Sequence, residues 1–181
     1  MTWMHWLALL LALGLFWMVG AYNRLVRQRS TVLQAFGALD TFFVRWIALT
    51  SECLAALDDL SPDGGMADAH AAVAAATTQL GASLAVARAR PLDGGAIAAL
   101  GAGVQALAGA WQTLTSHDGG GDATVQGELA LWARQNESLR QQSVPARTAF
   151  NEAVASYNGA VVQFPASVLA WLFGFRQTHR L

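Results

Sequence analysis

The sequence has few of the groups from which enzymes and metal sites are built. Its 181 residues contain no lysine, one cysteine and four histidines. A single cysteine excludes a disulfide within the chain and argues against a cysteine-based zinc site. No two histidines stand at the i, i+4 spacing of metalloprotease helices, and the glycine run at 119–121 lacks the Lys-Ser/Thr pair of a phosphate loop. We therefore expect a protein that is not an enzyme and that uses neither a metal nor a cofactor.

Charge is also scarce. Charged residues make up 13% of the chain, about half of the roughly 25% that is usual in globular proteins. Eleven basic residues, all arginine, nearly balance twelve acids, so the formal net charge is -1. This composition gives no basic surface for nucleic acid, and we predict no nucleic-acid partner.

The longest apolar run lies at the N-terminus. Between Trp3 and Tyr22 no residue carries a formal charge, and aromatic residues mark both ends of the run. Twenty helical residues rise about 30 Å, which matches the hydrocarbon core of a bilayer. We predict a transmembrane anchor over residues 1–22. A cleaved signal peptide is the alternative, but such a peptide opens with Lys or Arg, and here the first is Arg24.

The charges beside this run predict its orientation. Arg24, Arg27 and Arg29 follow the run, whereas no Lys or Arg precedes it. Since basic residues favour the cytoplasmic side, the N-terminus is expected outside and the remainder inside. The sequence thus predicts a single-pass protein whose body lies in the cytoplasm.

Helical spacing continues beyond the anchor. Apolar residues recur every three or four positions to about residue 60 without a proline, which predicts one helix longer than 50 residues. Turn clusters at 61–65 and 117–121, together with Pro91, separate three further helices, and Pro145 is expected to bend or break the last one. Short turns favour antiparallel packing. The predicted fold is all-α, a transmembrane helix continuous with an antiparallel four-helix bundle.

This reading divides the chain into an anchor (1–22), a bundle (23–164) and an apolar tail (165–181). In an up-and-down bundle the fourth helix returns to the membrane, so Phe164–Phe175 should arrive near Tyr22. We expect the headgroup layer to contain Tyr22, Arg24, Trp171, Phe173 and Phe175. Alternatively, the tail caps the end of the core.

Two segments resemble the LemA family. The first follows the apolar run and contains Tyr22-Asn23-Arg24-Leu25-Val26, Arg29, Val32, Ala35 and Leu39-Asp40. The second is similar to the closing motif of that family and contains Ala146-Arg147, Phe150-Asn151, Val154, Tyr157-Asn158, Val161, Phe164-Pro165, Ala170 and Gly174-Phe175. The middle of the chain departs from the family pattern, so the chain resembles a divergent member. The resemblance implies an anchored four-helix bundle in a bacterial cytoplasmic membrane, and it supplies no active site.

The polar residues of these two segments are candidates for a structural seam. Counting in antiparallel register from Asn23 opposite Phe164 places Asp40 opposite Arg147, which suggests a charge-assisted pair between the first and fourth helices. The other members of the expected seam are Asn151 near Phe36 and Asn158 near Arg29. Alternatively, each charge points to solvent.

The functional expectation is a membrane-anchored, non-enzymatic scaffold or adaptor whose partners are the lipid bilayer and another protein. Small residues at heptad-like spacing also suit a self-associating structural subunit. A third alternative is an accessory or regulatory subunit of a membrane enzyme such as a protease.

Overall fold

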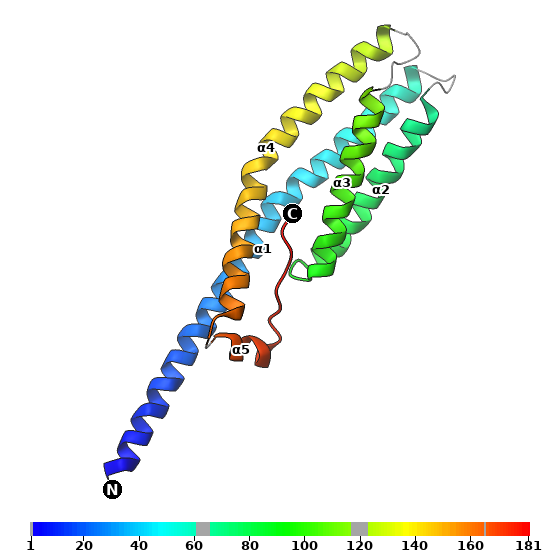
Figure 1. The fold of residues 1–181 in the computed structure, drawn as a ribbon. Helices are drawn as coiled ribbons and strands as arrows, with labels where there is room; N and C mark the ends of the chain where they lie inside the picture. Colours follow the sequence, from blue (N-terminus) through cyan, green and yellow to red (C-terminus); the bar gives the residue numbers. More distant parts are fainter. Residues whose placement is uncertain (1, 61–65, 117–122, 165) are drawn as a thin grey trace.

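The computed structural model describes residues 2–60, 66–116, 123–164 and 166–181, and within these ranges the chain forms helices and turns but no strand. The helices in chain order are α1 (Thr2–Leu60), α2 (Ala67–Ala89), α3 (Gly94–Ser116), α4 (Ala123–Val162) and α5 (Ala166–Phe173) (Figure 1). The predicted all-α fold is confirmed. The predicted turn clusters at 61–65 and 117–121 lie outside the described residues.

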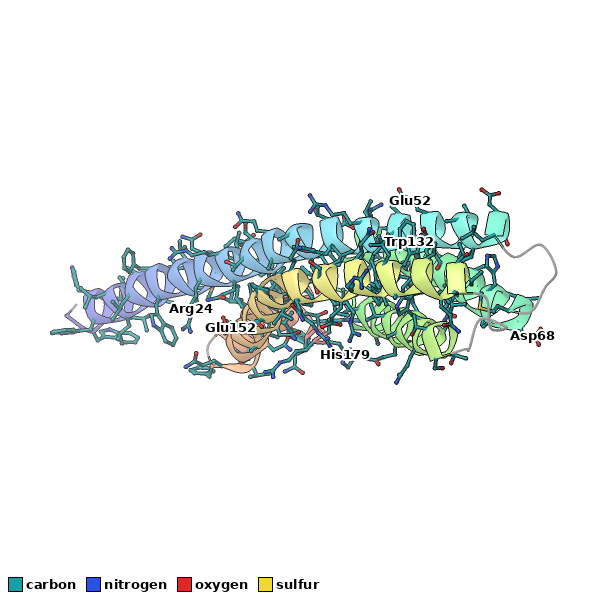
Figure 2. The ribbon with its side chains drawn as sticks, turned by 90° about the horizontal axis from the view of Figure 1, so that it is seen from above. Arg24, Glu52, Asp68, Trp132, Glu152 and His179 are labelled. Atoms are coloured by element: carbon teal, nitrogen blue, oxygen red, sulfur yellow. The ribbon has the colours of Figure 1, made fainter. Side chains whose placement is uncertain are left out.

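The long first helix is also confirmed. α1 has 59 residues and continues without a break to Leu60. At about 1.5 Å per residue it is roughly 90 Å long. Every side chain from Trp3 to Gly20 is exposed, and this part of the helix extends beyond all other elements (Figures 1 and 2).

By length and composition alone, two helices are able to cross a membrane, and they are α1 and α3. No residue of the most apolar window of α1 is buried, whereas 33% of that of α3 is buried. The apolar side chains of α3 therefore contribute to the protein core, while those at the start of α1 are left exposed. Trp17 at the end of this stretch contacts Phe164, with 6.2 Å between the ring centroids.

The second half of α1 packs against α4 along a seam with a seven-residue repeat. Buried residues at this interval are Leu25, Val32, Leu39, Trp46 and Cys53. Such spacing keeps one stripe of a helix facing its neighbour over many turns. On the α4 side, the ring of Phe150 lies 6.1 Å from that of Phe36. The register counted from the sequence places Phe36 opposite Asn151. The observed contact of Phe36 with Phe150 therefore agrees with the predicted register to within one residue.

α2 and α3 form a close helical hairpin. Apolar residues that recur every three or four positions of α2 are buried: Ala69, Val73, Ala76, Leu80, Leu84 and Ala87. The hairpin is tightest at Gly103, where an added Cβ would lie 2.9 Å from Ser83 Oγ and 3.3 Å from Leu80 Cα. A side chain at this position would force the two helices apart.

The four long helices run alternately up and down (Figure 1), and one continuous cluster of buried apolar residues draws on all of them. α1 pairs with α4, α2 pairs with α3, and α2 joins the pairs through α1, whereas α3 and α4 make little direct contact. α4 stays helical through Pro145, and Figure 1 shows it changing direction near its middle, so proline bends this helix without breaking it.

The chain reverses after α5. Gly174 is the one residue in the described ranges with a positive φ, at 69°. The Phe175 N–H donates to the Ala170 carbonyl oxygen at 2.8 Å, which closes the helix end in the way typical of a left-handed glycine cap. Residues 174–181, called the tail from here on, then run back between α3 and α4 (Figure 1).

Candidate functional site

The expected Asp40–Arg147 pair does not form. Asp40 instead accepts two hydrogen bonds from Arg88 on α2, at 2.6 Å from Nε and 3.0 Å from Nη2. This hydrogen bonding raises the pKa of Arg88. The prediction was wrong because it considered only the contact of α1 with α4, whereas α1 also packs against α2 and Asp40 lies on that side.

Arg147 and the two asparagines of the expected seam bind the tail instead of α1. Asn158 donates from Nδ2 to the Thr178 carbonyl oxygen at 2.8 Å and accepts from the Thr178 N–H at 3.0 Å. Asn151 makes the same pair of bonds with Leu181, at 2.7 Å and 2.8 Å. Arg147 Nε adds a 2.9 Å bond to the Leu181 carbonyl oxygen.

The spacing of these bonds has a simple geometric origin. Asn151 and Asn158 lie seven positions apart on a helix, which corresponds to about 10.5 Å. Thr178 and Leu181 lie three positions apart in an extended segment, which corresponds to about 10 Å. The two repeats match, so two side-chain amides hold an extended backbone at regular intervals. We call these two residues the asparagine ladder.

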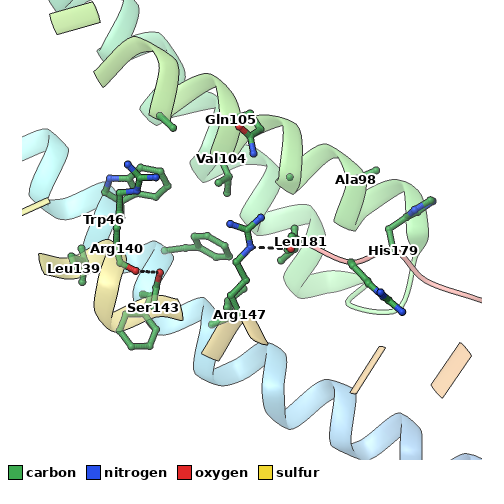
Figure 3. A pocket seen from close by; sticks show the side chains of 16 residues that line it. Trp46, Ala98, Val104, Gln105, Leu139, Arg140, Ser143, Arg147, His179 and Leu181 are labelled. Carbon is green, nitrogen blue, oxygen red and sulfur yellow. Dashed lines mark hydrogen bonds between the residues drawn. The ribbon is translucent and has the colours of Figure 1, made fainter. Parts of the chain in front are cut away.

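The other side of the tail rests on the start of α3. An added Cβ at Gly94 would lie 2.8 Å from His179 Cδ2, so a larger residue there would require the His179 ring or the tail to shift. The tail is thus wedged between α3 and α4, which explains why these two helices barely touch. His179 points along this edge of α3 (Figure 3).

Beyond Leu181 the space between α3 and α4 stays open. A cavity of about 420 Å³ has a floor of Leu39, Phe42, Phe43 and Trp46 from α1, and it is also lined by Arg140, Arg147, Arg180 and Leu181 (Figure 3). A second cavity of about 540 Å³ adjoins it and shares Gln105, Ala108 and Arg140. We call the two together the α3–α4 groove.

Two buried polar side chains line this groove without a partner in the described part of the chain. Both amide atoms of Asn136, which is 2% exposed and lines the second cavity, make no hydrogen bond. The indole Nε1 of Trp46, in the floor of the first cavity, is likewise unbonded. Buried groups of this kind are uncommon, because each loses its bonds to water without replacement.

At the other end of the tail, the aromatic residues come together around Tyr22. Its ring lies 5.2 Å from that of Phe173 and 6.5 Å from that of Phe175, so the expected return of this segment to Tyr22 is confirmed. Phe175 turns inward under Arg29, whose Cζ lies 5.9 Å from the ring. Trp171 remains 83% exposed, and Arg24 is also exposed.

α5 caps the end of the core, which is one of the two roles expected of residues 165–181. Ala166, Leu169 and Ala170 are buried against the end of the core. Trp171, Leu172 and Phe173 are more than half exposed, although they are apolar. One face of α5 packs on the core and the other face stays exposed.

The side chains of Cys53 and His70, which carry potentially reactive groups, have roles in packing. Cys53 is fully buried, and burial, with a smaller contribution from Glu128, raises the pKa of its thiol to about 12. His70 Nε2 lies 3.1 Å from the Leu54 carbonyl oxygen and 3.2 Å from Asp58 Oδ1, which links α2 to the end of α1. Within the described ranges no group of three His, Cys, Asp or Glu side chains is placed to hold a metal ion.

No family model, curated protein or solved structure matches this chain. The resemblance to the LemA family therefore stays an expectation from the two sequence segments. Function has to be inferred from the chain's own residues, chiefly the exposed start of α1, the apolar face of α5 and the α3–α4 groove.

Proposed function

We propose that this chain is a single-pass membrane protein of the LemA type, which acts as a non-enzymatic adaptor. The first part of α1 spans the bilayer, and the rest holds a partner protein beside the membrane. The observation that carries the proposal is the uninterrupted exposed apolar surface of residues 3–20. The eighteen residues are about 27 Å long as a helix, close to the thickness of a hydrocarbon core.

Water is an unsuitable surrounding for this surface. Soluble monomers rarely expose apolar patches larger than a few hundred Å². Here the exposed fractions include 70% for Trp3, 62% for Leu11 and 80% for Phe16. Lipid tails would cover these side chains at no cost, and the helix satisfies its own backbone hydrogen bonds.

The apolar face of α5 supports the same position of the bilayer. α5 lies across the axis of α1 at the level where the free part of α1 begins (Figure 1). Its exposed Trp171 and Phe173, together with Tyr22, are residues that favour the interface between hydrocarbon and water. We infer that α5 lies in the headgroup layer and that the bundle projects from it.

Exposed arginines support the orientation. Arg24, Arg27 and Arg29 follow the apolar segment and are exposed, as the cytoplasmic side of a span prefers. We propose that the N-terminus lies outside and the bundle in the cytoplasm of a bacterial cell. Cys53 is not a candidate nucleophile, because it is buried and the pKa of its thiol is raised.

Membrane anchoring is tested by placing charge in the proposed span. Replacing both Leu10 and Leu11 with Arg should cost about 6 kcal/mol of insertion free energy and release the protein from carbonate-washed membranes. The matched control replaces Val44 and Val86, exposed apolar residues of the bundle, with Arg. Release of both variants, or of neither, would contradict the proposed anchor.

Topology needs a separate experiment. In a Cys53→Ser background, a new cysteine at the exposed Ser116 should react with a membrane-impermeant thiol reagent only after the cells are opened. Labelling of intact cells would place the bundle outside and reverse the proposed orientation.

A further inference from the structure

The α3–α4 groove continues the path that the tail follows along α4. The polar face of α4 that binds the tail through Asn158, Asn151 and Arg147 does not end at Leu181. It continues with Ser143, Arg140 and Asn136, which line the groove. Steps of three and four positions keep side chains on one face of a helix. The groove therefore offers the next part of a surface that already holds an extended chain.

Asn136 carries the same side-chain amide as the two residues of the asparagine ladder, but no described backbone segment is bonded to it. Asn151 uses one amide to donate to and accept from the backbone of a single residue, Leu181. Asn136 is the same residue type on the same face of α4, it is buried, and neither of its amide atoms has a partner among the described residues. A peptide backbone beside Asn136 would satisfy both atoms.

The arginines that line the groove favour an acidic ligand. Arg140, Arg147 and Arg180 line the first cavity, and its lining contains no Asp or Glu. Glu137 lines the second cavity, but it accepts a hydrogen bond from Gln141 at 2.9 Å and lies 3.9 Å from Arg140. Carboxylates on a partner would find arginines that are able to bind them in a bidentate manner.

The dimensions suit a short extended segment. Arg147 and Asn136 lie eleven positions apart, which is about 16.5 Å of helix and corresponds to about five residues of extended chain. The aromatic floor of Phe42, Phe43 and Trp46 would receive the apolar side chains of such a segment. A cavity of about 420 Å³ is within the usual range for ligand sites.

We propose that the α3–α4 groove binds an extended acidic segment of a partner protein, with apolar residues at alternate positions. Its backbone bonds to Asn136 as the tail bonds to Asn151, its carboxylates face the three arginines, and its apolar side chains pack on the floor. This proposal names the partner class of the proposed adaptor and so rests on that function. Binding to the groove nevertheless does not depend on which side of the membrane the bundle faces.

The test uses the full chain in lipid nanodiscs and a fluorescein-labelled peptide, Asp-Leu-Asp-Phe-Asp-Leu-Asp, with binding read by fluorescence anisotropy. We expect saturable binding that the matching Lys-Leu-Lys-Phe-Lys-Leu-Lys peptide does not show. Arg140→Glu should weaken binding by about tenfold or more. The matched control is Arg134→Glu, which makes the same charge change at an exposed position of α4 outside the groove and should change binding less than about twofold.

Two further variants separate groove binding from general electrostatics. Asn136→Leu keeps every charge and should still weaken binding, because the backbone bonds are lost. Ala108→Phe places a ring where the two cavities meet and should block binding while the thermal unfolding midpoint stays close to that of the parent.

Three results would overturn the proposal. The first is no saturable binding of the acidic peptide to the folded parent. The second is equal binding of the two peptides, or equal weakening by Arg134→Glu and Arg140→Glu. The third is tight binding of laurate in the groove with no peptide binding, which would assign the site to an anionic amphiphile. Co-elution of the chain with the nanodisc is measured before the peptide is added. A failure of the proposed anchor then appears as loss of co-elution, and a failure of the groove proposal as loss of peptide binding.

Discussion

The asparagine ladder gives the sharpest test of how the tail is held. Each asparagine makes two hydrogen bonds to the tail backbone, between 2.7 and 3.0 Å long. A hydrogen bond contributes about 0.5–1.5 kcal/mol net, so Asn151→Ala or Asn158→Ala should lower the free energy of unfolding by about 1–3 kcal/mol. The loss should be larger for Asn151, because its removal also loosens the Leu181 carbonyl oxygen that Arg147 binds.

The double variant should lose less than the sum of the single losses. Once one amide is removed, part of the tail is already free, so the second removal has less ordered structure to release. Urea unfolding of the detergent-solubilised protein measures the three free energies. Hydrogen exchange at the amides of Thr178 and Leu181 reports the tail directly, and it should accelerate in each variant before global unfolding.

The control is Asn23→Ala, which removes an exposed asparagine from α1. It should leave both the unfolding free energy and the tail amides unchanged. If Asn151→Ala and Asn158→Ala behave like this control, the tail is not held by the ladder in solution, and the path into the groove loses its support.

The remaining predictions concern Gly94, Cys53 and Asn136. Gly94→Ala should displace the tail, because the new Cβ would clash with His179, and hydrogen exchange at Thr178 should rise, whereas Gly109→Ala, with open space beside it, should not have this effect. Cys53 should react with a thiol reagent only as fast as the protein unfolds. Because burial raises the pKa of its thiol from 9.0 to about 12, the free energy of unfolding should fall as the pH rises from about 9 towards 12. Asn136→Leu should raise the free energy of unfolding by about 1–2 kcal/mol without peptide, because an unsatisfied buried amide is removed.

Much of the fold was accessible from periodicity alone. The seven-residue repeat of α1 and the apolar positions of α2 follow from the rule that helix faces recur every three or four residues. The register of α1 against α4 could also be counted, as the contact between Phe36 and Phe150 demonstrates. These features depend on the spacing of apolar residues along the chain, which can be read directly from the sequence.

The pairing of polar residues was not accessible in the same way. Asp40 has two neighbouring helices, and the sequence does not say which of them carries its partner. Arg88 on α2 stands 48 positions away, with no spacing rule to connect the two. A charged residue on a helix that packs against two others has several possible partners. Counting the register of α1 against α4 considers only those on α4.

The docking of the tail was missed for a different reason. Apolar residues dominate the first part of 165–181, whereas the segment from Arg176 to Leu181 is polar and shows no periodicity that would predict where it binds. An extended segment bound through its backbone leaves little trace in its own side chains, because the bonds use groups that every residue has. The sequence signal for this binding lies on α4, where two asparagines stand seven positions apart.

The tail connects the two surfaces on which the proposed function depends. One end begins at α5, where Phe173 and Phe175 contact Tyr22 at the level of the proposed membrane surface. The other end, Leu181, lines the groove. Because the asparagine ladder bonds the tail to α4 between these points, the position of Leu181 at the groove depends on Asn151 and Asn158.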